Sequence, residues 1–219
     1  MPDSIGVRWV MIGAGLSVLV LFAMAVAAFA ALMAVAAPPK PATLVITVTG
    51  YDWWWKADYG DFVTANELHI PTGVPVYIRL QSADVIHAFW VPQLAGKTQL
   101  IPGVSTHQWL QADRPGVYRG QCTQFCGLQH AHMAFAVIAQ PPAQFAAWKA
   151  HQLQPAPPPD SARLAQGQLD FMIHCAVCHT IRGTTAGGIL GPDLTHLMSR
   201  GSIAANTLPD TPGYLSGWI

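Results

Sequence analysis

The sequence predicts a mainly β protein that follows one membrane-spanning helix and ends in a small helical segment. Three observations support this fold class. The N-terminal part is long, apolar and uncharged; the middle of the chain alternates apolar and polar residues; and a helical pattern returns after residue 141. With 219 residues, the chain has room for one ordinary domain and a smaller one.

The N-terminal segment runs from Trp9 to Ala37 without a charged residue. A helix of that length reaches about 43 Å, more than the hydrocarbon core of about 30 Å. A cleaved signal peptide is the alternative, because Ala34-Val35-Ala36 offers a small-residue site, but its apolar region normally runs only about 7 to 15 residues. We therefore expect residues 1–41 to hold one transmembrane helix at about 9–37.

The overall charge excludes one class of partner. The formal net charge is zero, only 10% of the residues are charged, and no basic run is present. Nucleic-acid binding normally requires a basic surface. We expect no nucleic-acid partner and a chain that works at a membrane.

Residues 42–140 show the period of two that is typical of half-buried strands. Leu44, Ile46 and Val48 alternate with more polar neighbours, and the same pattern recurs over residues 76–81. Shorter runs at 85–91, 116–119 and 133–138 are separated by Pro/Gly turns. This spacing predicts a β-sandwich or barrel.

The pattern becomes helical after the predicted strands. Phe145 and Trp148 lie three residues apart on one helical face, and a proline-rich stretch follows at 155–159. We interpret 141–160 as a helix with a semi-rigid linker. The remaining residues, 161–219, form the second predicted domain, which opens with a helix.

A short stretch from Gly120 to Met133 carries four soft or borderline metal ligands: Cys122, Cys126, His130 and Met133. Thiolate and thioether ligands select copper or zinc over hard cations, and the methionine favours copper that carries electrons over a closed zinc site. A disulfide and a centre with a single copper remain the alternatives for the two cysteines.

A second redox signature follows, in which Cys175, Cys178 and His179 form Cys-x-x-Cys-His. This is the attachment motif of a c-type haem, in which the sulfurs form thioethers and the histidine is an axial ligand. Pro192 follows at a spacing typical of class I cytochromes c, and we expect its carbonyl to orient His179. A zinc site would lack a convincing fourth ligand. The two motifs use all four cysteines.

At this point the sequence resembles subunit II of the haem-copper cytochrome c oxidases, in a form with a fused C-terminal cytochrome c domain. The matching text is residues 84–92 around His87, Lys97 with residues 101–103, and the loop 120–133. The resemblance implies a cupredoxin-like β-barrel that holds a dinuclear copper centre, CuA. The uncharged run predicts one span, and because haem c is attached on the outer face of the bacterial inner membrane, we expect a single-pass protein of that membrane with both redox segments on the periplasmic side.

The same resemblance implies a ligand set for the copper ions. Cys122 and Cys126 would bridge the two ions, His87 and His130 would each bind one, and Met133 and the main-chain carbonyl of Gln124 would be weak axial ligands. By itself, a histidine such as His87 among apolar neighbours is more often a packing residue. The family usually has Glu at Gln124, and its interface magnesium uses that carboxylate.

Three consecutive tryptophans, residues 53–55, precede these motifs. Such residues normally serve core packing or an interfacial belt. In the resembling family this segment lies over the copper centre, and Trp53 matches the position where electrons enter.

The function implied by the resemblance is that of a cytochrome c oxidase subunit. Electrons from cytochrome c or haem c would pass through CuA to subunit I, which reduces oxygen to water; this chain would perform no catalysis alone. A CuA subunit of a nitric oxide or nitrous oxide reductase and a free-standing membrane-tethered carrier are the alternatives. A quinol oxidase subunit is disfavoured because that branch lacks the copper ligands.

Two departures from the family concern the membrane anchor and the haem segment, residues 161–219. Most members have two spanning helices, and this chain shows one. The methionine that forms the second axial haem ligand lies later in the family than Ile219, so we expect an incomplete cytochrome c domain. Met198 and His196 follow the Gly-Pro turn too closely to match that ligand, and neither is assigned.

Overall fold

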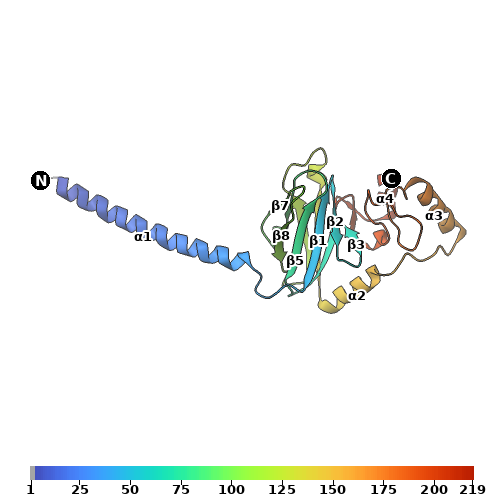
Figure 1. Cartoon of the computed structure of the whole chain (residues 1–219), viewed down its shortest axis with the longest axis horizontal. Helices are drawn as coiled ribbons and strands as arrows, with labels where there is room; N and C mark the ends of the chain where they lie inside the picture. Colours follow the sequence, from blue (N-terminus) through green and yellow to red (C-terminus); the bar gives the residue numbers. More distant parts are fainter. Residues whose placement is uncertain (1–2) are drawn as a thin grey trace. The chain divides into compact units, whose positions relative to one another are not determined.

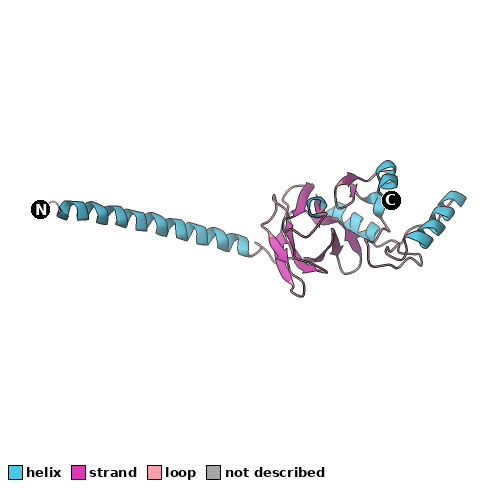
Figure 2. Cartoon of the chain, turned by 90° about the horizontal axis from the view of Figure 1, so that it is seen from above, coloured by secondary structure: helices cyan, strands magenta, loops and turns pink. Residues whose placement is uncertain are grey.

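The computed structural model describes residues 3–219. The chain divides into two compact units, Met1–Pro39 and Lys40–Ile219. Helical structure begins the chain and returns after residue 141, whereas most strands lie between residues 44 and 140 (Figure 2). This distribution confirms the predicted mainly β fold with an N-terminal apolar helix and a small helical C-terminal part.

The first unit is the helix α1 (Asp3–Ala36), the blue ribbon in Figure 1. Its stretch Ser4–Ala36 has a mean hydropathy of 2.8, and among residues 3–219 it is the one helix long and apolar enough to cross a bilayer. Its apolar side chains are exposed on every side, as in a helix whose surroundings are lipid. The helix covers nearly all of the predicted span.

The second unit contains two five-stranded sheets. The first, whose strands β5, β1 and β2 lie side by side in Figure 1, has the order β3-β2-β1-β5-β8. Its strands are β1 (Leu44–Tyr51), β2 (Trp54–Asp58), β3 (Val63–Ala65), β5 (Val76–Ser82) and β8 (Thr106–Leu110). The second sheet has the order β4-β10-β9-β6-β7. Its strands are β4 (Glu67–Pro71), β6 (His87–Trp90), β7 (Thr98–Leu100), β9 (Gly116–Cys122) and β10 (Ala134–Gln140).

The core consists of the inward-facing residues of both sheets. Ile46 and Val48 of β1 are fully buried while Val45 is exposed, as the alternation in the sequence predicts. An aromatic cluster lies at the centre, where the Trp55 ring centroid is 5.8 Å from Phe89 and 5.1 Å from Phe135. These large side chains bury much of the apolar surface that stabilises the fold.

Shorter elements complete the second unit. They are η1 (His130–His132), α2 (Pro142–Gln152), α3 (Ala162–His174), η2 (Leu197–Ser199), β11 (Ser202–Ile203), β12 (Leu208–Pro209) and α4 (Pro212–Trp218). Helix α2 packs on the barrel through Phe145 and Trp148, as its pattern predicts. The Trp148 ring stacks on His69 with centroids 4.0 Å apart.

Gly120 of β9 leaves room for the ring of Phe135, which extends from the neighbouring strand β10. A Cβ atom at this position would lie 2.2 Å from the ring of Phe135, closer than real contacts. Because the ring is held by Trp55 and Phe89, it has little room to move. The glycine is therefore required by packing.

We predict that Gly120→Ala lowers the free energy of unfolding by about 1–3 kcal/mol, the usual cost of overpacking a core. Adding Phe135→Leu should restore part of the loss. Denaturant unfolding of the copper-free chain measures both. Gly96→Ala is the control, because a Cβ there meets nothing within 4 Å. An unchanged stability in Gly120→Ala would contradict this account.

Candidate metal centre

The centre is built where strand β6 pairs with strand β9. Phe89 lies opposite Cys122 in this antiparallel pair, and Thr123 N donates to Ala88 O at 3.2 Å. Strand β6 begins at His87, and β9 ends at Cys122. The pairing therefore places His87 beside Cys122, although 34 residues lie between them in the sequence.

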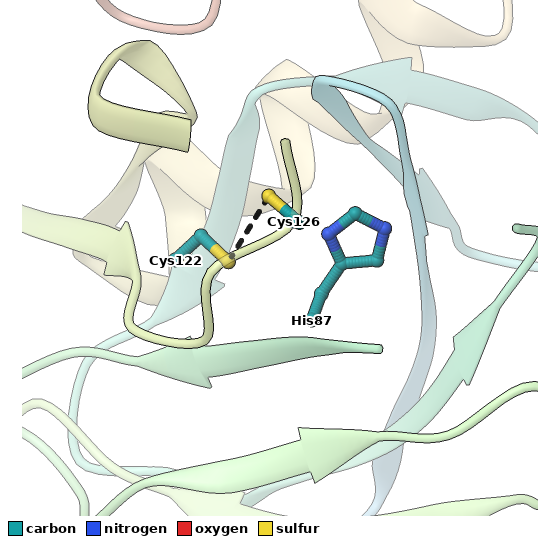
Figure 3. Close-up of side chains that lie close together, drawn as sticks. All are labelled: His87, Cys122 and Cys126. Atoms are coloured by element: carbon teal, nitrogen blue, oxygen red, sulfur yellow. Dashed lines mark hydrogen bonds between the residues drawn. The ribbon is translucent and has the colours of Figure 1, made fainter. Parts of the chain in front are cut away.

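Figure 3 shows one ring nitrogen of His87 pointing toward the sulfurs of Cys122 and Cys126. The ligand atoms of these three residues lie within 4.8 Å of one another, and all three residues are buried. Nε2 of His87 lies 2.7 Å from Asp84 Oδ1, whereas the buried Nδ1 has no hydrogen-bond partner. An orphaned buried nitrogen that faces two sulfurs fits a metal ligand.

The two sulfurs lie 3.9 Å apart, and both cysteines are free. A disulfide bond would require about 2.05 Å. The separation is less than twice a sulfur–metal bond of about 2.3 Å, so one ion can contact both sulfurs. The geometry of the free thiols thus fits shared metal ligands.

The remaining predicted ligands surround these sulfurs. Cys126 Sγ lies 3.4 Å from His130 Nδ1 and 3.7 Å from Met133 Sδ, and Cys122 Sγ lies 3.2 Å from Gln124 O. Met133 is fully buried. The structure brings all six predicted ligand residues together; their role as ligands stays a prediction.

Hydrogen bonds hold the loop in this shape. Cys122 N donates to Met133 O at 3.0 Å, which closes the loop where β9 and β10 pair. The amide of Gln121 donates to the carbonyls of His130 and Met133, both at 3.3 Å. A preformed loop spends little entropy on binding a metal.

The two thiols differ in acidity. Burial alone would raise the pKa of Cys122, but the neighbouring imidazole of His87, main-chain groups of Ala88 and Gln124 and the thiol of Cys126 lower it below its usual value. Burial and the neighbouring charge of Cys122 raise the pKa of Cys126 to about 12. The charge of one thiolate therefore makes deprotonation of the other thiol costly, and a bound cation would offset the repulsion between two thiolates.

Trp53 touches the centre directly. Its indole Nε1 donates to Cys126 O at 2.9 Å. Gly127 follows, with φ at +115°, and a Cβ there would lie 3.0 Å from the Trp53 ring, so the loop needs glycine. Trp54 instead stacks on Tyr51 with centroids 4.5 Å apart.

The haem motif lies just after helix α3. His179 Nδ1 lies 2.8 Å from Pro192 O, the contact that the motif predicts. Cys175 and His179 line a cavity of about 970 Å³, together with apolar residues such as Phe171 and Leu194, whereas Cys178 is not among its lining residues. The volume lies near the upper end for cofactor sites. A free Nε2 on an oriented His179 fits an axial ligand.

The same cavity reaches the predicted copper loop, residues 120–133. Trp53 and His132 belong to its lining, as do Met198 and His196. His196 Nε2 lies 2.9 Å from Gln154 O, so this nitrogen already has a partner. The structure thus brings the predicted electron-entry residue and the haem motif to one cavity.

Sequence reasoning missed two kinds of residue. Asp84, which orients His87, lies in the matching motif three residues before the histidine, and that spacing was the available signal. The contacts of residues 200–207 with the barrel had no sequence signal, because each hydrogen bond joins segments far apart in the chain and pairs a main-chain group with a side chain or with another main-chain group.

The fold and site define a cupredoxin-like domain with a buried sulfur and imidazole centre. Residues 63–140 match the family model described as cytochrome C oxidase subunit II, periplasmic domain. The periplasmic domain of subunit II of cytochrome oxidase from Bradyrhizobium japonicum superposes with a TM-score of 0.50 at 30% identity, covering 52% of this chain and 95% of that one. The chain belongs to the cytochrome c oxidase subunit II family.

Curated relatives agree with this family assignment. Cytochrome c oxidase subunit 2 of Alkalihalophilus pseudofirmus is 37% identical over 180 residues, which are 81% of this chain and 52% of the relative. Quinol oxidase subunit 2 of Bacillus cereus is 35% identical over 118 residues, 54% of this chain and 40% of that protein. The chain spans about half the length of these relatives or less. The candidate span and the periplasmic match agree with the predicted single-pass inner-membrane location.

We predict that Asp84→Ala lowers the affinity of the chain for cupric ion by about 10- to 100-fold, because the ring of His87 loses the acceptor that fixes its tautomer and orientation. Competitive titration with a chelator measures this. Asp113→Ala is the matched control, since Asp113 accepts only an exposed hydrogen bond from Gln111. Equal affinities in the two variants would show that Asp84 does not support the centre.

Proposed function

We propose that this chain is the electron-transfer subunit of a terminal cytochrome c oxidase. One observation carries the proposal: six donor groups, from β6, the end of β9 and the loop between β9 and β10, converge on one place, and two of them are free sulfurs. Relatives named as oxidase subunits favour oxygen over nitrogen oxides as the final acceptor.

The donor set supports a dinuclear copper centre. Cys122 and Cys126 would bridge two ions, His87 and His130 would supply one imidazole each, and Met133 and the carbonyl of Gln124 would be the weak ligands. When bound, the copper pair accepts and passes on one electron at a time. The presence of these donors separates the chain from quinol oxidase subunits, which it also resembles in sequence.

The chain's own residues prepare the centre for fast electron exchange. His87 and Met133 are fully buried, and Cys122 and Cys126 are 2% and 6% exposed, so water is largely excluded. The ligand side chains are held by main-chain and side-chain hydrogen bonds. A rigid, dry site needs little rearrangement when its charge changes.

Cys175, Cys178 and His179 would hold a covalent haem c. The support is the cavity at Cys175 and His179 and the hydrogen bond between His179 and Pro192. Haem supplies a second one-electron centre. Trp53, which lines this cavity and donates to Cys126 O, would then lie on the route from haem to copper.

The partners follow from this role. We propose that the chain assembles with a haem-copper subunit I and other oxidase subunits in the membrane, and that cytochrome c is the external donor. Helix α1 would anchor the chain there.

We predict that Trp53→Phe slows reduction of the copper centre about tenfold, equivalent to about 1.4 kcal/mol in activation free energy, because the contact with Cys126 O is lost. Stopped-flow mixing of the copper-loaded chain with reduced cytochrome c measures the rate, and the copper absorption spectrum should stay unchanged. Trp54→Phe is the control. Equal rates in both variants would contradict the assignment, and no reduction of the wild type would contradict the proposed function.

A further inference from the structure

The hairpin formed by β11 and β12 contacts the barrel at the copper loop. Ala134 N donates to Ala205 O at 3.2 Å, and Thr207 Oγ1 donates to His132 O at 3.3 Å. These two barrel residues flank Met133. The hairpin therefore binds the main chain on both sides of a proposed copper ligand.

Further contacts spread over three adjacent strands of the second sheet. Asn206 Nδ2 donates to Phe135 O in β10, and Arg119 of β9 donates to Asn206 O, both at 3.4 Å. Gly201 N donates to Glu67 Oε1 in β4 at 2.7 Å. The contacts thus cross β4, β10 and β9, which are neighbours in the sheet.

The hairpin tip has a backbone shape that needs support. Ala204, Ala205 and Asn206 have φ values of 51°, 50° and 60°, in the left-handed region that residues with a Cβ atom disfavour. Ala205 is 6% exposed and Ile203 is 5% exposed. Such a tip persists where surrounding contacts hold it.

Charge complementarity points to the same arrangement. Glu67 is a barrel carboxylate that is only 3% exposed, and its Oε2 lies 3.7 Å from His69 Nε2. Arg200, next to Gly201 in the haem segment, interacts electrostatically with Glu67, Asp193 and Asp210. A buried carboxylate is costly without hydrogen-bond partners, and Gly201 N of the haem segment supplies one to Glu67.

We propose that the β11–β12 hairpin is a built-in docking element that fixes the haem segment on the copper loop, beside Met133. The consequence is a fixed distance between the haem motif, residues 175–179, and Trp53, in place of a domain that swings on its linker. The identity of the two redox groups rests on the proposed function, whereas the docking itself rests on the contacts of the chain.

Hydrogen exchange on the full chain in detergent tests the docking without any cofactor. The amides of Ala134 and Gly201 should be protected in the wild type. In Asn206→Ala/Thr207→Val, which removes two side-chain hydrogen bonds to the barrel, they should exchange about tenfold faster, while the core amide of Ile78 is unchanged. Thr184→Val is the matched control, since its hydroxyl bonds to Ile181 O within the haem segment.

Two outcomes would overturn the proposal: unprotected amides at Ala134 and Gly201 in the wild type, or equal exchange in the double variant and the control. In chains loaded with haem and copper, the double variant should also slow haem-to-copper transfer about tenfold after photoreduction, at an unchanged copper spectrum. An unchanged transfer rate would refute the positioning role. A chain that binds neither group but shows the exchange pattern would refute the proposed function and leave the docking intact.

Discussion

The antiparallel pairing of β6 with β9 is the constraint on which the proposed metal centre depends. It places the strand that begins at His87 beside the strand that ends at Cys122, and the loop to β10 then returns Cys126, His130 and Met133 to the same place. Because sheet register has a period of two, a slip of one residue would turn the side chain of His87 away from the sulfurs. The register of the barrel strands therefore determines whether the proposed ligands can meet.

The aromatic core of the barrel also packs against the proposed centre. Trp55 lies against both Phe89 and His87, with ring centroids 5.8 Å and 6.1 Å away, so the core that stabilises the barrel also supports the proposed ligand His87. Asp84 completes this support from the exposed side. The proposed ligands are held firmly because they belong to strands and to a loop closed by those strands.

Much of this could be predicted from the sequence. The period of two predicted the strands, and the uncharged run predicted helix α1. The spacing of Cys122, Cys126, His130 and Met133 pointed to the loop, because residues this close in the sequence stay close together in the fold. His87 required a family resemblance, because nothing in its own segment distinguishes a ligand from a packing histidine. The docking of residues 200–207 could not be predicted, since its hydrogen bonds join main-chain and side-chain groups of segments that are far apart in the sequence.

The paired copper centre is the central claim, and electron paramagnetic resonance of the copper-loaded full chain tests it most directly. With two bridging sulfurs, one unpaired electron is shared, so the account predicts a hyperfine pattern from two equivalent copper nuclei. Loss of that pattern in Cys126→Ser would accompany it. A pattern from a single copper nucleus in the wild type would contradict the account.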